Sequence, residues 1–168
     1  YRLQRETLVK RVTEAKLPTR HAGELRSYVY RSEFHGGEHL ALVKGDLSLD
    51  KTVLTHVHVE STFSDVFGGD EGSSRSKLQK ALKKIGEREE GILIYLRRPY
   101  PGELEEQILS DGTQKLFGLQ KSNMRDYGVG AQILRDLGVS KIEVLSSNEK
   151  SLNGLEIFGI NVCGHVQL

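Results

Sequence analysis

Cysteine, long apolar runs and an excess of either charge are scarce in this sequence. Its single cysteine, Cys163, excludes an internal disulfide framework and a zinc site built from several cysteines of one chain. No apolar run approaches the roughly 18–20 residues of a membrane helix, and no opening stretch resembles a signal peptide. One thiol and no export signal predict a cytoplasmic protein. The formal net charge of +1 argues against a protein that coats nucleic acid, and we expect no membrane partner.

The 168 residues are enough for one domain with a proper core. A hydrophobic share of 37% and a charged share of 28% are ordinary for a soluble globular protein. The chain begins at Tyr1 rather than at Met, and we interpret it as a piece of a longer protein. We predict that residues 1–20 form a linker or a short helix, and that residues 21–168 form one domain.

Hydrophobic periodicity predicts strands first and then an alternation of strands and helices. Ser73 or Ser74 is a suitable N-cap for a helix whose apolar residues repeat at i, i+3, i+4 and i+7. We expect strands over 24–31, 39–44, 52–61, 91–96, 141–145 and 160–166. We expect helices after Ser74 and over 126–137 and 152–158, and one helix and a loop within 103–122. This order predicts an α/β fold, a single domain with a mixed β-sheet and flanking helices.

The strand expected over 52–61 places three possible metal ligands on one face. His56, His58 and Glu60 stand at i, i+2 and i+4, so their side chains point the same way. Two histidines and a carboxylate can hold a metal as a facial triad. The alternative interpretation is that these residues serve only the strand, and we favour it.

The loop over 68–74 precedes a helix, where backbone N–H groups can hold a phosphate. It lacks the lysine spacing of a P-loop, and Asp70 and Glu71 would repel an anion. We therefore interpret this segment as a solvated loop.

Several separated segments, taken in order, resemble GTP cyclohydrolase II. They are residues 14–19, residues 39–46, Val57-His58-Val59-Glu60 with residues 65–68, and residues 125–134 with 137–139. The resemblance implies an α/β dimer that opens the imidazole ring of GTP and releases formate and pyrophosphate. In this family three cysteines hold a zinc ion, which lowers the pKa of a bound water to about 7. Magnesium binds at the triphosphate, and an arginine is the nucleophile toward phosphate.

At the three positions where the family has its zinc-binding cysteines, this chain has Ser61, Gly72 and Ser74. A serine hydroxyl is not deprotonated near neutral pH, and glycine offers no side-chain ligand, whereas tetrahedral zinc sites use thiolate, imidazole or carboxylate. We therefore expect no zinc and no other cofactor, and magnesium only where a nucleotide is bound. Cys163 lies outside the motif, and we expect it to be a buried small apolar residue.

Further departures lie around the expected active site. Asn123 stands where the family has an aspartate that acts as a base, and an amide cannot accept a proton usefully. Arg125, at the position of the nucleophile, is retained, and we interpret it as vestigial. Arg97, His58 and Glu60 match family positions and are the candidates for substrate binding. The family's glutamate and arginine after residue 97 are missing, and so is a phosphate-side lysine near 146–151.

The resemblance is to the C-terminal half of proteins that fuse 3,4-dihydroxy-2-butanone 4-phosphate synthase to GTP cyclohydrolase II, with residues 1–20 as the linker from the synthase. We predict a catalytically impaired domain, not itself an enzyme, that serves the fused synthase as a structural, dimerisation or regulatory module. A homodimer is expected. Two alternatives stay open: an active hydrolase with a rearranged or absent metal site, and a non-catalytic sensor of GTP or another nucleotide that uses Arg97 and Arg125.

Overall fold

A computed structural model describes residues 8–33, 37–48, 50–68, 72–97, 102–115, 124–147 and 153–168. Seven strands in these residues form one sheet in the order β1-β2-β3-β5-β4-β6-β7. The strands are β1 (Val9–Thr19), β2 (Gly23–Ser32), β3 (Glu38–Lys44), β4 (Val53–Val59), β5 (Gly91–Leu96), β6 (Lys141–Ser146) and β7 (Asn161–Gln167). The helices are α2 (Thr62–Phe67), α3 (Ser74–Gly86), α4 (Glu103–Lys115), α5 (Met124–Asp136) and α6 (Asn153–Ile157).

The sheet is mixed, as the sequence predicts. β1, β2, β3 and β5 pair antiparallel, and the strands expected over 24–31 and 39–44 are present as β2 and β3, which pair as a hairpin. β4 lies parallel to both β5 and β6, and β6 is parallel to β7. Parallel strands end at a common edge, where α/β proteins usually place their sites. The carboxyl ends of β4 and β5 therefore mark where a site is to be sought.

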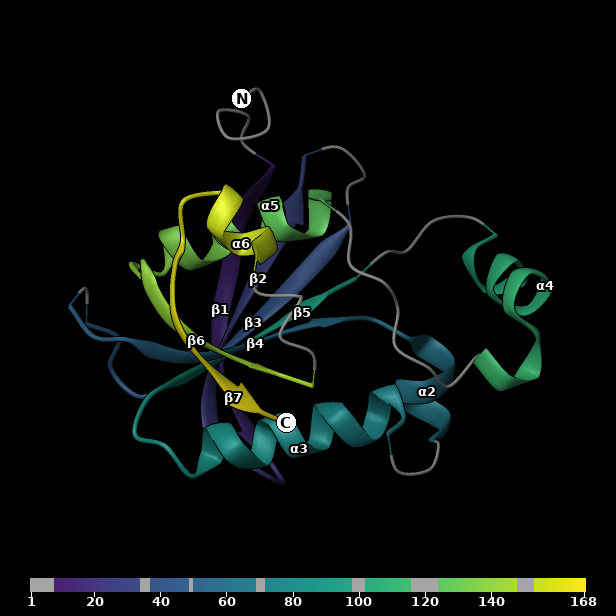
Figure 1. Ribbon diagram of the computed structural model, residues 1–168, viewed down its shortest axis with the longest axis horizontal. Helices are drawn as coiled ribbons and strands as arrows, with labels where there is room; N and C mark the ends of the chain where they lie inside the picture. The colour runs from purple at the N-terminus through teal and green to yellow at the C-terminus, as the bar shows by residue number, and fades with distance from the viewer. Residues whose placement is uncertain are drawn as a thin grey trace.

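Helices cover both faces of the sheet (Figure 1). α5 and α6 lie on one face, where the larger apolar cluster includes Ile92, Ile133 and Phe158. α3 lies on the other face, and its Ala81 and Ile85 pack against Leu54 and Leu93. Ser73 caps α3 by accepting a hydrogen bond from the backbone N–H of Ser76, which confirms it as the N-cap. The predicted fold class is confirmed.

The first part of the chain differs from the prediction. Residues 9–19 form the edge strand β1 instead of a linker or a short helix, so they belong to the domain. Most of β1 is exposed on both faces, which explains why its charged residues hid the strand pattern. Its start is fixed to α5, because Gln132 Oε1 accepts the backbone N–H groups of Leu8 and Val9 at 2.7 and 3.3 Å.

Two smaller expectations are also corrected. Cys163 is exposed on β7, which is an edge strand, and it is therefore not a buried apolar residue. The chain after β4 forms the short helix α2, which the sequence analysis did not predict. Of the loop interpreted as solvated, residues 69–71 lie outside the described part of the chain.

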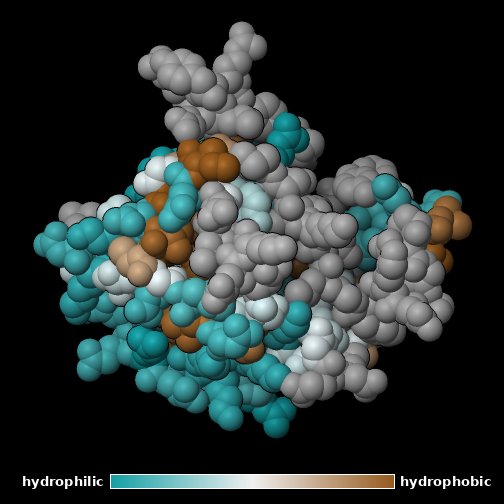
Figure 2. Space-filling model, viewed as in Figure 1, coloured by the Kyte–Doolittle hydropathy of each residue, from teal (hydrophilic) through white to brown (hydrophobic). Residues whose placement is uncertain are grey.

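Among the coloured atoms in view, hydrophilic ones predominate, and apolar ones lie left of centre and on the projecting α4 (Figure 2). Leu104, Ile108 and Leu109 of this helix are exposed. None of the described helices is long and apolar enough to span a bilayer.

Candidate functional site

A buried cluster of polar side chains lies where β4 and β5 end. His58 comes from β4 and Tyr95 from β5, and the two are register partners in the parallel pair. Their rings are stacked, with centroids 5.5 Å apart. The chain after β4 turns into α2 at Ser61 and supplies Asp65, and α3 begins at Ser74. Segments far apart in the sequence thus meet at one point.

The carboxylate of Asp65 is the centre of this cluster. Its Oδ1 accepts the hydroxyl of Ser74 at 2.7 Å, and its Oδ2 accepts the hydroxyl of Tyr95 at 2.7 Å and the backbone N–H of Ser61 at 3.0 Å. His58 Nε2 lies 3.2 Å from Oδ1 and 3.0 Å from Ser74 Oγ. Only 5% of the Asp65 side chain is exposed. Both carboxylate oxygens are therefore satisfied inside the protein.

These partners fix the proton on His58. Asp65 as a carboxylate only accepts hydrogen bonds, and the Ser74 hydroxyl already donates to it. Toward His58, Ser74 Oγ can therefore act only as an acceptor, so Nε2 of His58 carries the proton. The Asp65 carboxylate, the Ser74 and Tyr95 hydroxyls and His58 Nε2 then have consistent donor and acceptor roles.

Hydrogen bonding sets the acidity of the cluster. Burial alone would raise the pKa of Asp65, but the hydrogen bonds from His58, Ser61 and Tyr95 outweigh it and lower the pKa to about 2. Burial and the adjacent Asp65 carboxylate raise the pKa of Tyr95 well above its ordinary value. At neutral pH the cluster therefore holds an ionised aspartate beside a neutral tyrosine.

The three positions of the family's zinc ligands do not fit zinc in this chain. Ser61 and Ser74 are both fully buried, and the Ser74 hydroxyl donates to Asp65. Gly72 has no side chain and adopts a positive φ of 86°, which disfavours any L-residue with a ligand there. Structural zinc sites need thiolate, imidazole or carboxylate donors, and residues 61, 72 and 74 offer none.

The possible triad on β4 is engaged in three separate ways. His56 Nδ1 lies 2.7 Å from the carbonyl oxygen of Leu145, and His58 faces Ser74 and Asp65. Glu60 Oε1 lies 3.5 Å from Arg97 Nε. Among the described residues, no group of three or more His, Cys, Asp or Glu side chains is placed to hold a metal ion.

The remaining predicted site residues are spread over the same edge and α5. Arg97 follows β5, and its backbone N–H donates to His39 Nδ1 at 3.0 Å. Arg125 is exposed in the first turn of α5. Asn123 lies outside the described residues. The structure thus places Glu60 beside Arg97, and substrate binding by Arg97, His58 and Glu60 stays a prediction.

Sequence reasoning missed the two residues that organise this site. Asp65 lies in a segment quoted only for its family resemblance, and Tyr95 lies in a run expected to be a buried strand. A polar residue in the middle of an apolar strand is a usable signal, because a buried hydroxyl needs a partner.

Comparisons with known proteins agree with this fold. The family model of GTP cyclohydrolase II matches residues 10–167. The riboflavin biosynthesis protein RibBA of Parabacteroides distasonis is 33% identical over 178 residues, and that of Aquifex aeolicus is 36% identical over 181 residues. Each alignment covers 100% of this chain and 44% of the relative.

A solved structure is also similar. It is the crystal structure of RibBX, a two domain 3,4-dihydroxy-2-butanone 4-phosphate synthase from A. baumannii, with a TM-score of 0.65 and 26% identity over 99% of this chain and 42% of that one. The chain thus spans less than half the length of these relatives. The family match runs through the β4, α2 and α3 segments that build the Asp65 cluster and through α5. The chain therefore belongs to the GTP cyclohydrolase II family.

Proposed function

We propose that this domain does not catalyse the GTP cyclohydrolase II reaction and serves as a structural or regulatory module of a riboflavin-biosynthesis protein. The observation that carries the proposal is the closed hydrogen-bond network at the family's zinc positions. The Ser74 hydroxyl donates to Asp65, Ser61 is buried, and Gly72 has no side chain that could bind a metal. The family's zinc positions in this domain therefore offer no ligand, and none of the described residues forms another site at which zinc would activate water.

The relatives support a role beside a synthase. RibBX matches 99% of this chain with less than half of its own length, and it is described as a two domain 3,4-dihydroxy-2-butanone 4-phosphate synthase. A domain of this fold thus occurs in a protein named for its synthase activity. We infer that this chain is likewise joined to a synthase domain, which makes the parent protein an enzyme, and we propose the cytoplasm as its location. The domain then contributes to dimerisation or stability.

The residues at two family positions, 123 and 125, are consistent with lost chemistry. The family's base position is Asn123, whose amide is a poor proton acceptor at neutral pH. Arg125 remains, but it is exposed at the first turn of the helix. An arginine without a base and without an activated water has no means to start the hydrolysis.

Formate release from GTP tests the proposal. With zinc and magnesium supplied, this chain is expected to release no formate above the rate without protein, and to contain no stoichiometric zinc. A family member that retains the cysteines serves as the positive control under the same conditions. Turnover at an ordinary enzymatic rate of about 1 s⁻¹ or more would contradict the proposal.

Nucleotide sensing is the second candidate, and the retained arginines favour it. Arg97 is partly exposed at the carboxyl edge of β5, and Arg125 is exposed on α5. GTP with magnesium at about 100 times its Kd is expected to raise the free energy of unfolding by about 2.7 kcal/mol by mass action. A sensor would lose this gain in stability in Arg125→Ala. It would keep the gain in Arg88→Ala, because Arg88 is exposed after α3 and is not one of the two arginines proposed to bind the nucleotide. If GTP with magnesium does not change the free energy of unfolding of the unmodified chain, the sensor role is excluded and the purely structural role stays.

A further inference from the structure

We infer that the carboxylate of Asp65 holds together, without a metal ion, the segments that the family's zinc site joins. The inference rests on the proposed absence of zinc and adds what holds this part of the fold together. A metal bound at positions 61, 72 and 74 would tie the chain after β4 to the start of α3. Asp65 connects the same two segments through its own hydrogen bonds, from Ser61 N–H at one oxygen and from Ser74 Oγ at the other.

The network reaches further than those two segments. Tyr95 joins β5 to the same carboxylate oxygen as Ser61, and His58 joins β4 to the side of Ser74. A second link lies beside it, because the buried Ser64 of α2 accepts the backbone N–H of Arg75 of α3 at 3.2 Å. One carboxylate thus receives hydrogen bonds from β4, β5, α3 and the start of α2.

The chemistry of the donors suits a carboxylate and not a neutral group. Ser61 presents a backbone N–H, which cannot reverse its role, and the two hydroxyls each donate at 2.7 Å. Hydrogen bonds to a charged acceptor are about twice as strong as neutral ones. An asparagine at position 65 has the same shape, but its amide would turn a donor toward one of the two sets of donors.

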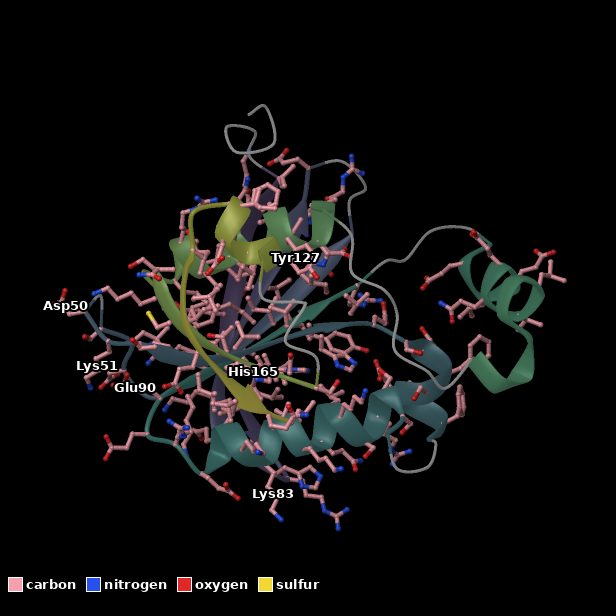
Figure 3. The ribbon with its side chains drawn as sticks, viewed as in Figure 1. Asp50, Lys51, Lys83, Glu90, Tyr127 and His165 are labelled. Carbon is pink, nitrogen blue, oxygen red and sulfur yellow. The ribbon has the colours of Figure 1, made fainter. Side chains whose placement is uncertain are left out.

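Substitution of Asp65 tests the inference by thermal unfolding. Asp65→Asn is expected to lower Tm by roughly 5–10 °C, because it removes charge-assisted hydrogen bonds without leaving a cavity. Asp50→Asn is the matched control, with an expected change of about 1 °C or less. Asp50 is exposed and lies at the end of the molecule opposite α2 (Figures 1 and 3). An Asp65→Asn variant that melts like the unmodified chain would overturn the inference.

A double-mutant cycle separates a shared network from simple packing. Tyr95→Phe is expected to lower Tm by roughly 3–6 °C in the unmodified chain and by much less in the Asp65→Asn background, because the lost bond is the same. Tyr28→Phe is the control, since Tyr28 is buried, whereas Tyr95 is partly buried, and the Tyr28 hydroxyl has only a long contact of 3.5 Å from Arg26 Nη1. Additive losses would overturn the inference.

Two outcomes need separate interpretation. If Asp65→Asn does not fold, Tyr95→Phe and Ser74→Ala must each lower Tm more than Tyr28→Phe does, or the inference fails. A chelator is expected to change the Tm of the unmodified chain by about 1 °C or less. A large drop on chelation would show a bound metal and defeat both this inference and the proposed function, whereas a failed Asp65 test without a chelator effect defeats only the inference.

Discussion

At pH 4 the domain is expected to be about 3 kcal/mol less stable than at pH 7 because of His56 alone. Burial lowers the pKa of His56 to about 4 from its ordinary 6.5, and the carbonyl of Leu145 opposes this only in part. His58 and Lys77 lower the pKa further. Nε2 has no hydrogen-bond partner among the described residues, so a proton added there would be buried without an acceptor.

The direction of this pH dependence follows from the number of protons bound by the folded and by the unfolded state. Between pH 6.5 and 4 the unfolded chain has a protonated His56 while the folded domain keeps it neutral. The unfolded state therefore binds more protons, and stability falls as the pH is lowered through this window. Below pH 4 the His56 contribution is constant. The lowered pKa of Asp65 gives a separate loss, which begins below its ordinary value of 3.8 and is complete below about 2.

Urea unfolding over a series of pH values measures this effect. His56→Gln has no titrating group at position 56, so the loss of stability between pH 7 and 4 is expected to be about 3 kcal/mol smaller in this variant. His21→Gln is the control, because His21 is exposed beside the turn between β1 and β2, and its pH dependence should match the unmodified chain. Parallel curves for His56→Gln and the unmodified chain would contradict the prediction.

The alternation of apolar residues was enough to predict most of the sheet, but not the edge strand β1. β4 shows the rule at work: Val53 and Val59 face α5, and Leu54 faces α3, as the period of two requires. β1 shows its limit. An edge strand with solvent on both faces has no apolar face to reveal, so Lys10, Arg11 and Lys16 made it resemble a linker.

The candidate site was predictable by position more than by contact. The resemblance to the family placed Ser61, Gly72 and Ser74 at the positions of its zinc-binding cysteines. The sequence did not show which contacts connect these positions. The partners of Asp65, which are Ser61, Ser74 and Tyr95, come from separate segments that meet only in the folded domain. A local pattern suggested a triad of His56, His58 and Glu60, and the three side chains found separate partners instead.

The apolar face of α5 is expected to contribute far more to the free energy of unfolding than Arg125, the arginine retained from the family. Ile133→Ala is expected to lower the free energy of unfolding by about 2–5 kcal/mol, because Ile133 is fully buried and its loss leaves a cavity. Arg125→Ala is expected to change it by about 0.5 kcal/mol or less, since Arg125 is exposed. Urea midpoints at pH 7 measure both, with Arg135→Ala as a third variant on the same helix. Arg135 Nη1 donates to the Phe158 carbonyl at 2.7 Å, so an intermediate loss of about 1 kcal/mol is expected.

This contrast distinguishes the two reasons for which a sequence can keep this helix. Ala131, Ile133 and Leu134 are fully buried against the sheet, and Gln132 fixes the start of β1. Those contacts require the helix whether or not the domain has any activity. Suppose that Arg125→Ala costs as little stability as expected and that no formate is released. Residues 125–134 then resemble the family because their apolar side chains serve the core. If Arg125→Ala abolishes a nucleotide-dependent gain in stability, the exposed face of α5 has kept a binding role that the core does not require.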